Sequence, residues 1–393
     1  MEKEALISKK NCLKASFFDF EKTVRKFRYS CLFGVGKRAE SWGYEFIKWL
    51  NLKNIIGFTD NNPDTWGKVI IDNLKCIPPS ELVKYGKDMI CIMLVQESVQ
   101  DQISVQFKEW GIETIGTKFE WIYVDSLIEK YFNIHLPGIW EGTTRMGQYN
   151  KAIEREEKIA VYTCIVDGYD DLKQPLTCDS QCDYYCLGLE KPEKLGIYHW
   201  IDISDLIPEY LRNDYTRINR YCKIHPHILF PEYKYSVYVD GSITIQTEIS
   251  HLMSKIGKTG FASYGMPFAN DIYEHAASVF LRNGLGEADG KELVVRQMQR
   301  YALEGFPRFF GLTENGVLVR NHSNSNCIRI MNTWWNEVLN FSRRDQLSFM
   351  YAVWKNGFSP KDIGYIDDTF REGPEFGLKL YHNKNTDVKR FGN

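Results

Sequence analysis

One stretch constrains the fold more than any other: Pro231–Gln246, which reads PEYKYSVYVDGSITIQ. Apolar and aromatic residues run up to Val239, Asp240-Gly241-Ser242 interrupts them, and Ile243 resumes the pattern. A run of this kind that ends in an acidic residue and a glycine predicts a buried strand, with the carboxylate of Asp240 at the edge of a sheet. The alternative interpretation is a hairpin, because Asp-Gly is the commonest two-residue hairpin loop.

Length, charge and cysteine content narrow the class of protein. At 393 residues the chain is long for one domain, so we expect two. The formal net charge of −2 provides no overall field for nucleic acid, and we expect no nucleic-acid partner. The ten cysteines form no CxxC pair, which predicts free thiols in a reducing compartment. No apolar run resembles a signal peptide or a membrane span, so we expect a cytoplasmic protein.

A small α/β domain is predicted over residues 29–125, after a helical segment at 1–28. Its expected elements are strands at 29–33, 54–58 and 89–94, a helix from the glycine-rich turn to residue 50, and a helix at 100–110. Strand, glycine-rich turn, helix, strand and acidic residue follow each other as in a dinucleotide-binding unit. Gly34 and Gly36 would admit a phosphate to the N-terminus of the helix, and Asp60 would hold a ribose. Bound NAD, another bound nucleotide, and a purely structural or docking role all remain open.

A helical connector is predicted at 126–157, followed by a second domain at 158–393. The connector contains expected helices at 125–133 and 146–158. The second domain has expected strands at 158–166, 184–189 and 198–203, a helix at 214–224, and then the strand that ends at Asp240.

The helix before the central strand has three cations in the pattern Arg217-x-x-Arg220-x-x-Lys223. Residues three apart on a helix are neighbours, so we expect one basic face beside Asp240. Arginine binds phosphate through two parallel hydrogen bonds and lysine binds it as a point charge. A diphosphate site and an ordinary solvated basic face are the two interpretations.

A tryptophan pair and a polar segment follow in the C-terminal half. Trp334 and Trp335 would offer flat faces to a sugar ring. Ser342 is a good N-cap with Asp345 three residues later, close to a capping box. Asp345 therefore has a structural interpretation and also a functional one, as a carboxylate at the rim of a cleft.

Histidines and a further carboxylate complete the candidates. His225 and His227 form a His-x-His pair that lacks an evident third ligand, whereas His322 stands alone in the C-terminal half as the better metal or phosphate candidate. Glu274 lies at the start of an expected helix and could act as a general base toward a sugar hydroxyl, although a solvated surface position explains it as well.

Several of these segments together resemble a known family. They are KIAVYTCIVDGYDDL, RINRYCKIHPHILFPEYKYSVYVDGSI, IYEHA and WWNEVLNFSRRDQLSF. In combination they are similar to the glycosyltransferase-like family typified by plant seed-mucilage and turgor-regulation proteins. In the first domain, FGVGKRAE, GFTDNNPDTWGK and IPPSEL resemble the Rossmann-like domain that is often fused to bacterial surface-polysaccharide enzymes.

The resemblance implies an α/β protein with a Rossmann-like βαβ domain and a GT-A-type glycosyltransferase domain. It implies a hexosyl- or related transferase that moves a sugar from a nucleotide-sugar donor to a surface polysaccharide such as capsule or lipopolysaccharide. A divalent metal, Mn or Mg, would be held by Asp240 and His322. The remaining implied roles are donor contacts from Thr163, Asp167, Arg217, Arg220, Lys223 and Asp240, catalysis by Asp345 and Glu274, and acceptor contacts from Trp334, Trp335 and Asp345. Ser242 departs from the family pattern, because an Asp-x-Asp motif would place a second carboxylate there.

Two other classes of function remain as alternatives. One is an NAD-dependent enzyme that modifies nucleotide-sugars through the Gly34–Gly36 turn. The other is a non-catalytic scaffold of a polysaccharide assembly complex. In both the transferase and the scaffold interpretation, we expect peripheral association with an assembly complex at the inner membrane.

Overall fold

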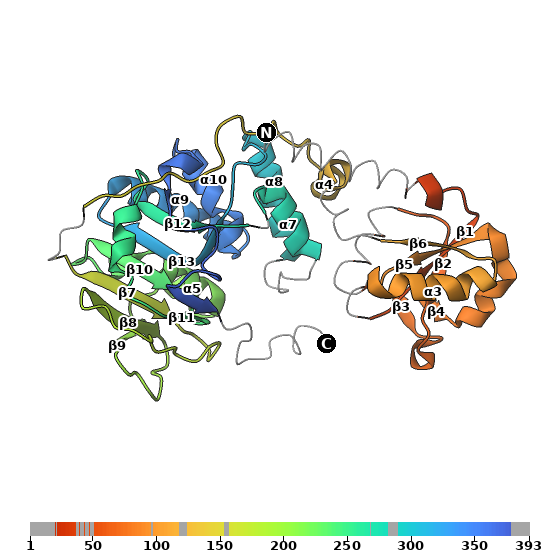
Figure 1. The fold of residues 1–393 in the computed structure, drawn as a ribbon, viewed down its shortest axis with the longest axis horizontal. Coiled ribbons are helices and arrows are strands. Elements are labelled where there is room, and N and C mark those ends of the chain that lie inside the picture. The colour runs from red at the N-terminus through yellow and green to blue at the C-terminus, as the bar shows by residue number, and fades with distance from the viewer. Residues whose placement is uncertain are drawn as a thin grey trace. The chain divides into compact units, whose positions relative to one another are not determined.

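The computed structural model describes residues 20–378 except 21, 37–38, 40–42, 44–46, 48–50, 96, 118–123, 153–156, 268 and 282–289. The described residues form two compact units, the first ending at Leu136 and the second beginning at Pro137. Residues from Ala276 to the end of α7 (Ile272–Leu281) group with the first unit. Each unit combines helices with a sheet that contains parallel strands (Figure 1), which confirms the predicted α/β class.

The first unit is built on a six-stranded sheet in the order β3-β4-β2-β1-β5-β6. Its elements are β1 (Tyr29–Phe33), β2 (Ile55–Thr59), β3 (Val69–Ile71), β4 (Leu74–Ile77), β5 (Met89–Met93), α3 (Glu97–Glu109), β6 (Glu113–Gly116) and α4 (Asp125–Phe132), with 3-10 helices at Pro63–Thr65 and Pro79–Asp88. The strands pair in parallel except for β3 with β4. Phe107 of α3 packs on Phe33 and Cys91 in the core. The expected strands and the helices near 100–110 and 125–133 are confirmed, whereas most of the helix after Gly36 and of segment 1–28 lies outside the described residues.

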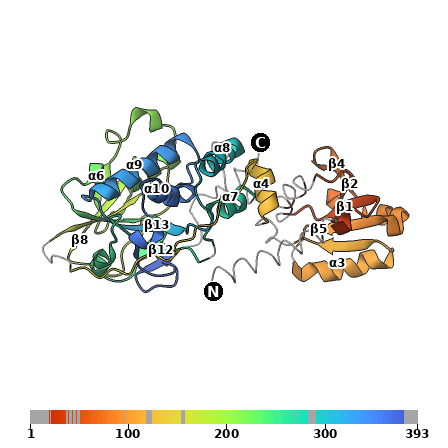
Figure 2. The same ribbon diagram turned by 90° about the horizontal axis from the view of Figure 1, so that it is seen from above.

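The second unit contains most of the remaining elements. They are β7 (Ile159–Cys164), β8 (Cys182–Gly188), β9 (His199–Asp202), α5 (Tyr215–Ile224), α6 (Pro226–Leu229), β10 (Tyr235–Val239), β11 (Ile243–Ile245), β12 (Phe261–Gly265), α7, α8 (Gly290–Leu303), β13 (Thr313–Asn321), α9 (Ser325–Asn340), α10 (Phe349–Lys355), β14 (Gly364–Tyr365) and β15 (Phe376–Leu378). Short 3-10 helices lie at Glu209–Leu211, Ser250–Lys255, Asp345–Leu347 and Pro360–Asp362. Figure 2 shows α9 and α10 beside the strands of this unit.

A seven-stranded sheet in the order β14-β12-β13-β10-β7-β8-β9 forms the centre of the second unit. The strands β9, β8, β7 and β10 are parallel to one another, and β13 runs antiparallel to β10. Every residue of β7 is buried, as expected for a central parallel strand. From β7 the chain proceeds outward to β9 and then returns through α5 to β10 on the opposite side of β7. The strand order therefore reverses between β7 and β10, which is where open α/β sheets bind ligands, beyond the carboxyl ends of the strands.

The two faces of this sheet have different partners, because side chains alternate along a strand. Val161 and Val237 belong to an apolar core with Ile243. On the other face, the hydroxyl of Tyr162 donates to the carbonyl oxygens of Cys222 and Lys223 near the end of α5, both at 3.1 Å. The Tyr162 face of the sheet is therefore the one that α5 covers.

The hairpin interpretation of Asp240-Gly241-Ser242 is wrong. Strand β10 pairs with β7 and β13, whereas β11 pairs with β15 in a separate two-stranded sheet. The turn therefore links two sheets, and Asp240 follows the end of a buried strand, as the first interpretation predicted.

Two local predictions are also wrong. The described residues of segment 146–158 contain no helix, and Gly147 instead forms an isolated β-bridge with Gly364. The capping box at Ser342 does not form, because its hydroxyl accepts from the backbone N–H of Arg344, at 3.2 Å, and α10 begins only at Phe349. The nine described cysteines are free thiols, as predicted. Among the described helices, none is long and apolar enough to cross a membrane.

Candidate functional site

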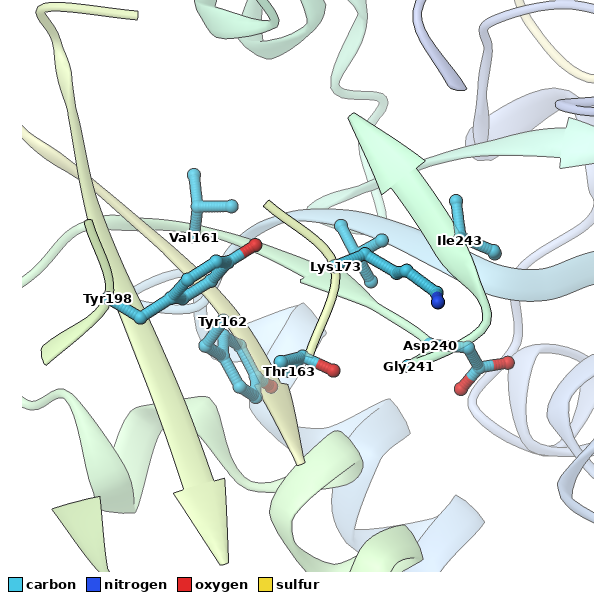
Figure 3. Close-up of a pocket in the computed structure, with 9 residues that line it drawn as sticks. Val161, Tyr162, Thr163, Lys173, Tyr198, Asp240, Gly241 and Ile243 are labelled. Atoms are coloured by element: carbon cyan, nitrogen blue, oxygen red, sulfur yellow. The ribbon is translucent and has the colours of Figure 1, made fainter. Parts of the chain in front are cut away.

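A pocket lies at the carboxyl ends of β7 and β10, where the strand order reverses (Figure 3). Its walls combine apolar side chains with three polar groups, and they comprise Val161, Tyr162, Thr163, Lys173, Tyr198, Val239, Asp240, Gly241 and Ile243. Figure 3 shows the side chain of Lys173 extending toward Asp240. A hydroxyl, an ammonium and a carboxylate thus converge on one small site.

The Thr163 hydroxyl is a buried polar group whose hydrogen bonding is not satisfied by the described residues. The residue is 5% exposed, and its Oγ1 has no hydrogen-bond partner among the described residues. A buried polar atom without a partner costs free energy, and a ligand that supplies one removes that cost.

The Asp240 carboxylate is held at the mouth of the pocket. Its backbone N–H donates to Gly316 O on β13 at 2.9 Å, and its side chain remains 35% exposed. The next residue, Gly241, packs tightly against the loop after β7, since a Cβ there would lie 3.0 Å from the Cβ of Asp170. Glycine therefore allows this loop to close on the end of β10.

Behind Asp240 lies a network of charges from α5 and the segment before α10. Lys223 Nζ is 3.5 Å from Asp240 Oδ1 and 2.7 Å from Asp345 Oδ2, and the side chain is only 2% exposed. Arg220 Nε lies 3.4 Å from Asp345 Oδ1. Of the four groups, Asp240 is the one with the largest exposed fraction. The network therefore fixes Asp240 from beneath.

Two members of this network, Arg220 and Asp345, keep each other ionised. Burial alone would raise the pKa of the Asp345 carboxyl, but Arg220 and Lys223 hold it below its usual value. Burial alone would lower the pKa of Arg220, but Asp345 and Asp240 hold it above its usual value. Asp345 is thus a permanent carboxylate at neutral pH that neutralises two cations. Its catalytic role stays a prediction.

A buried arginine that the sequence analysis did not single out supports this network. Arg320 of β13 is 0% exposed, and its guanidinium donates to Lys223 O at 2.7 Å and to the Tyr162 hydroxyl at 2.6 Å. These bonds fix the C-terminal end of α5, where Lys223 is located.

Lys173 and Tyr198 also line the pocket, and neither was among the predicted site residues. A lysine shortly after the acidic loop Asp167–Asp171 was an available signal for Lys173. No local pattern marks Tyr198, because only the assembled fold brings the segment before β9 to the pocket. Asp167 itself is exposed on that loop with a left-handed φ of 57°, outside the pocket wall, and its donor role stays a prediction.

Arg217 is separated from the other two cations of α5. Its guanidinium donates to Val338 O at 2.9 Å, to Phe341 O at 2.8 Å and to Asp214 Oδ2 at 2.7 Å. Three residues per step on a helix advance 300°, so Arg217 and Lys223 point about 120° apart. The prediction that Arg217 binds the donor is therefore corrected: it joins α5 to the end of α9.

The acceptor role predicted for the tryptophan pair is contradicted by burial. Trp334 is 0% exposed, and its Nε1 donates to Asp345 O at 2.8 Å. Trp335 is also buried and packs edge-on against Tyr221 and His225. Neither ring has a free face for a sugar, and both belong to the core under α9.

Glu274 is also engaged in the fold. Its carboxylate lies 3.2 Å from a guanidinium nitrogen of Arg308, which also pairs with the fully buried Asp271 at the start of α7. Glu274 is not part of the pocket wall. The structure thus gives it an ion-pair partner, and its predicted role as a base stays untested.

The residues expected to hold a metal do not meet. His322 is 2% exposed and uses both ring nitrogens, with Ser236 Oγ at 3.0 Å and Phe230 O at 3.1 Å. Burial, with the charge of Arg320, lowers its pKa to about 4. Asp240 is bonded to Gly316, six residues before His322 on an extended segment, which corresponds to roughly 20 Å at about 3.3 Å per residue. The metal role of His322 is therefore corrected.

The carboxylates beside the pocket, Asp240 and Asp170, do not by themselves form the ligand set of a resident metal ion. Ser242 supplies no carboxylate, and Asp240 already faces the ammonium of Lys223. Among the described residues, no group of three or more His, Cys, Asp or Glu side chains is arranged to hold a metal. We therefore derive no catalytic step through a metal.

In the first unit, the glycine-rich turn is closed by the residue expected to bind ribose. Gly34 has a φ of 106° and donates its N–H to Thr59 O at 3.0 Å. The backbone N–H of Val35 donates to Asp60 Oδ2 at 3.2 Å. A phosphate at this turn would meet a carboxylate, so the arrangement of Gly34, Gly36 and Asp60 does not favour a dinucleotide.

Comparison with known proteins identifies the family. A model described as TOD1/MUCI70, glycosyltransferase-like domain, matches residues 137–363, more than half of the chain. The chain belongs to this family. The description of this model, a glycosyltransferase-like domain, agrees with the class of enzyme predicted from the sequence.

Individual similarities are more distant. The probable hexosyltransferase MUCI70 of Arabidopsis thaliana is 23% identical over 217 residues, which are 49% of this chain and 36% of that protein. The match therefore spans about a third of that relative's length. The apo structure of the bifunctional glycosyltransferase WbbM has a TM-score of 0.33 at 11% identity, over 56% of this chain and 40% of that one.

Proposed function

We propose that the second unit transfers a sugar from a nucleotide-sugar donor to a glycan acceptor, with the donor bound at the carboxyl ends of β7 and β10. The observation that most supports this is the pocket itself, where the order of parallel strands reverses and Asp240 and the unpartnered Thr163 hydroxyl face one space. Membership in a glycosyltransferase-like family supports the same reaction.

In this proposal Asp240 binds the donor, and the acceptor reacts directly with the bound sugar. The Asp240 carboxylate accepts hydrogen bonds from hydroxyl groups of the ribose or the sugar, and Lys223 and Asp345 position it. The acceptor hydroxyl replaces the diphosphate at the anomeric carbon. The bonding electrons stay on the departing diphosphate oxygen, and the proton of the acceptor hydroxyl passes to that diphosphate. Arg220 and Asp345 stay charged throughout, because each shifts the pKa of the other toward its ionised form.

For the finer assignment we propose a hexosyl donor and a surface-polysaccharide acceptor such as capsule or lipopolysaccharide. The relative named a probable hexosyltransferase supports the donor class. The sequence resemblance of the first unit to domains fused to surface-polysaccharide enzymes supports the acceptor. With such an acceptor, the protein would act at the cytoplasmic face of a membrane and have an assembly complex as its partner.

A thermal-shift screen of nucleoside diphosphates and nucleotide-sugars tests the donor site. A ligand that binds only the folded chain raises the Tm, by about 5 °C at a hundredfold excess over its Kd. We expect one nucleotide family to raise the Tm of the wild type and to lose most of this effect in Asp240→Ala. A panel that leaves the wild-type Tm unchanged would refute the donor site.

A further inference from the structure

The negative charge of a nucleotide-sugar diphosphate requires a compensating cation in the pocket. Divalent metals commonly serve this purpose and bind through carboxylates and substrate phosphates. Here Ser242 replaces the second carboxylate, and Asp240 faces the ammonium of Lys223 at 3.5 Å. A cation that belongs to the chain itself is another way to balance the charge.

Lys173 is such a cation. It lies on the loop between β7 and β8, is half-buried and lines the pocket together with Thr163 and Asp240. Its side chain extends into the site toward Asp240 (Figure 3). Its Nζ makes no ion pair or hydrogen bond with any other residue in the part of the chain that the structure describes, whereas Lys223 is committed to Asp345 and Asp240. A half-buried ammonium in a pocket is a binding group for an anion.

We propose that Lys173 binds the diphosphate of the donor and neutralises the charge of the departing nucleoside diphosphate, so that the site binds its donor without a divalent metal. This inference rests on the proposed donor site and adds the group that contacts the phosphates. The ammonium neutralises the oxygen on which the bonding electrons remain, and the Thr163 hydroxyl, which has no partner among the described residues, donates a hydrogen bond to the same diphosphate.

The test is a calorimetric titration of the full chain with a panel of nucleoside diphosphates and their parent nucleosides, in EDTA and then in manganese. The variants are Lys173→Met, which removes the charge at similar length, and Lys173→Arg, which restores it. Lys194→Met is the matched control, because Lys194 is an exposed lysine of the same unit outside the pocket wall.

We expect the wild type to bind one nucleoside diphosphate equally well in EDTA and in manganese. Lys173→Met should weaken that binding by about tenfold or more, the usual loss for one charge-assisted hydrogen bond, and Lys173→Arg should recover most of it. Binding of the parent nucleoside should not change in any variant, which separates a phosphate contact from a general loss of structure. Lys194→Met should behave as the wild type.

Two results would overturn the inference and leave the donor site intact. One is binding that appears only with manganese, which would assign the phosphate charge to a metal on Asp240 and its neighbour Asp170. The other is unchanged diphosphate affinity in Lys173→Met. If no nucleoside diphosphate binds the wild type under either condition, the proposed function fails and the inference fails with it.

Discussion

At the scale of single residues, the site is a balanced set of charges with one member turned to solvent. Two cations, Arg220 and Lys223, face two carboxylates, and Asp240 has the largest exposed fraction of the four. A buried ion pair gains little net stability over apolar packing, but removal of one partner leaves an expensive unpaired charge. The network is therefore better explained as a support for Asp240 than as a source of stability.

We predict that Asp345→Asn lowers the free energy of unfolding by about 3 kcal/mol at pH 7, because it leaves the buried ammonium of Lys223 with Asp240 as its one carboxylate partner. Urea denaturation measures this. Asp205→Asn, at an exposed position after β9, is the control and should change stability by less than about 0.5 kcal/mol.

The same variant should change the acid dependence of stability. The folded pKa of Asp345 is below its unfolded value of about 3.9, so its contribution is present above that value and is lost as pH falls through the folded pKa. Asp345→Asn should therefore flatten the fall in stability below about pH 4. An identical acid profile in variant and wild type would contradict the ion-pair assignment.

The three cations of α5 show which side-chain positions a sequence pattern predicts and which it does not. The Arg-x-x-Arg-x-x-Lys spacing correctly predicted that Arg220 and Lys223 lie near Asp240, because residues three apart are neighbours on a helix. It failed for Arg217, because this residue lies six positions before Lys223 and points about 120° away from it around the helix. Burial excluded Trp334, and no local rule states that a tryptophan pair will face inward.

At the scale of elements, the strands of the parallel sheet were predictable and their partners were not. A continuous apolar run such as β7 identifies a buried parallel strand. The pairing of β11 with β15 joins residues more than a hundred positions apart, and only the assembled fold decides between it and a hairpin. The position of His322 at the far end of β10 is likewise a matter of strand register.

The contact between α5 and α9 gives a prediction at this scale. Arg217→Met should lower the free energy of unfolding by about 2 kcal/mol, because carbonyls at the end of α9 lose charged donors. Affinity of the folded protein for its nucleoside diphosphate should stay within about twofold of the wild type. Arg212→Met breaks an exposed pair with Glu209 and should be nearly neutral for stability. A selective loss of nucleotide affinity in Arg217→Met would restore its predicted donor role.

At the scale of the whole molecule, two α/β units share the chain, and the pocket with Thr163, Lys173 and Asp240 lies in the second. The first unit contains the three strands that its sequence predicted, yet in its glycine-rich turn the backbone N–H of Val35 donates to the carboxylate of Asp60. The motif correctly predicted a strand that ends in a glycine of positive φ, Gly34. The hydrogen bond from Val35 to Asp60 depends on how the Asp60 side chain is oriented, which no motif specifies.

We predict that NAD and NADP produce no change in Tm and that Gly36→Ala keeps the full response to the nucleoside diphosphate. A Cβ at Gly36 would meet no atom within 4 Å, so this variant should fold normally. A thermal-shift titration measures both effects. A rise in Tm with NAD that disappears in Gly36→Ala would relocate nucleotide binding to the first unit.

The most direct test of the central claim is donor turnover, measured as nucleoside diphosphate released from the nucleotide-sugar that the screen identifies, by the wild type and by Asp240→Asn. The substitution preserves size and removes the charge that accepts hydrogen bonds from the donor. We predict release by the wild type and a loss of kcat/KM of about tenfold to a hundredfold in the variant, at unchanged secondary structure. Equal turnover by both proteins would contradict a donor site at the carboxyl end of β10.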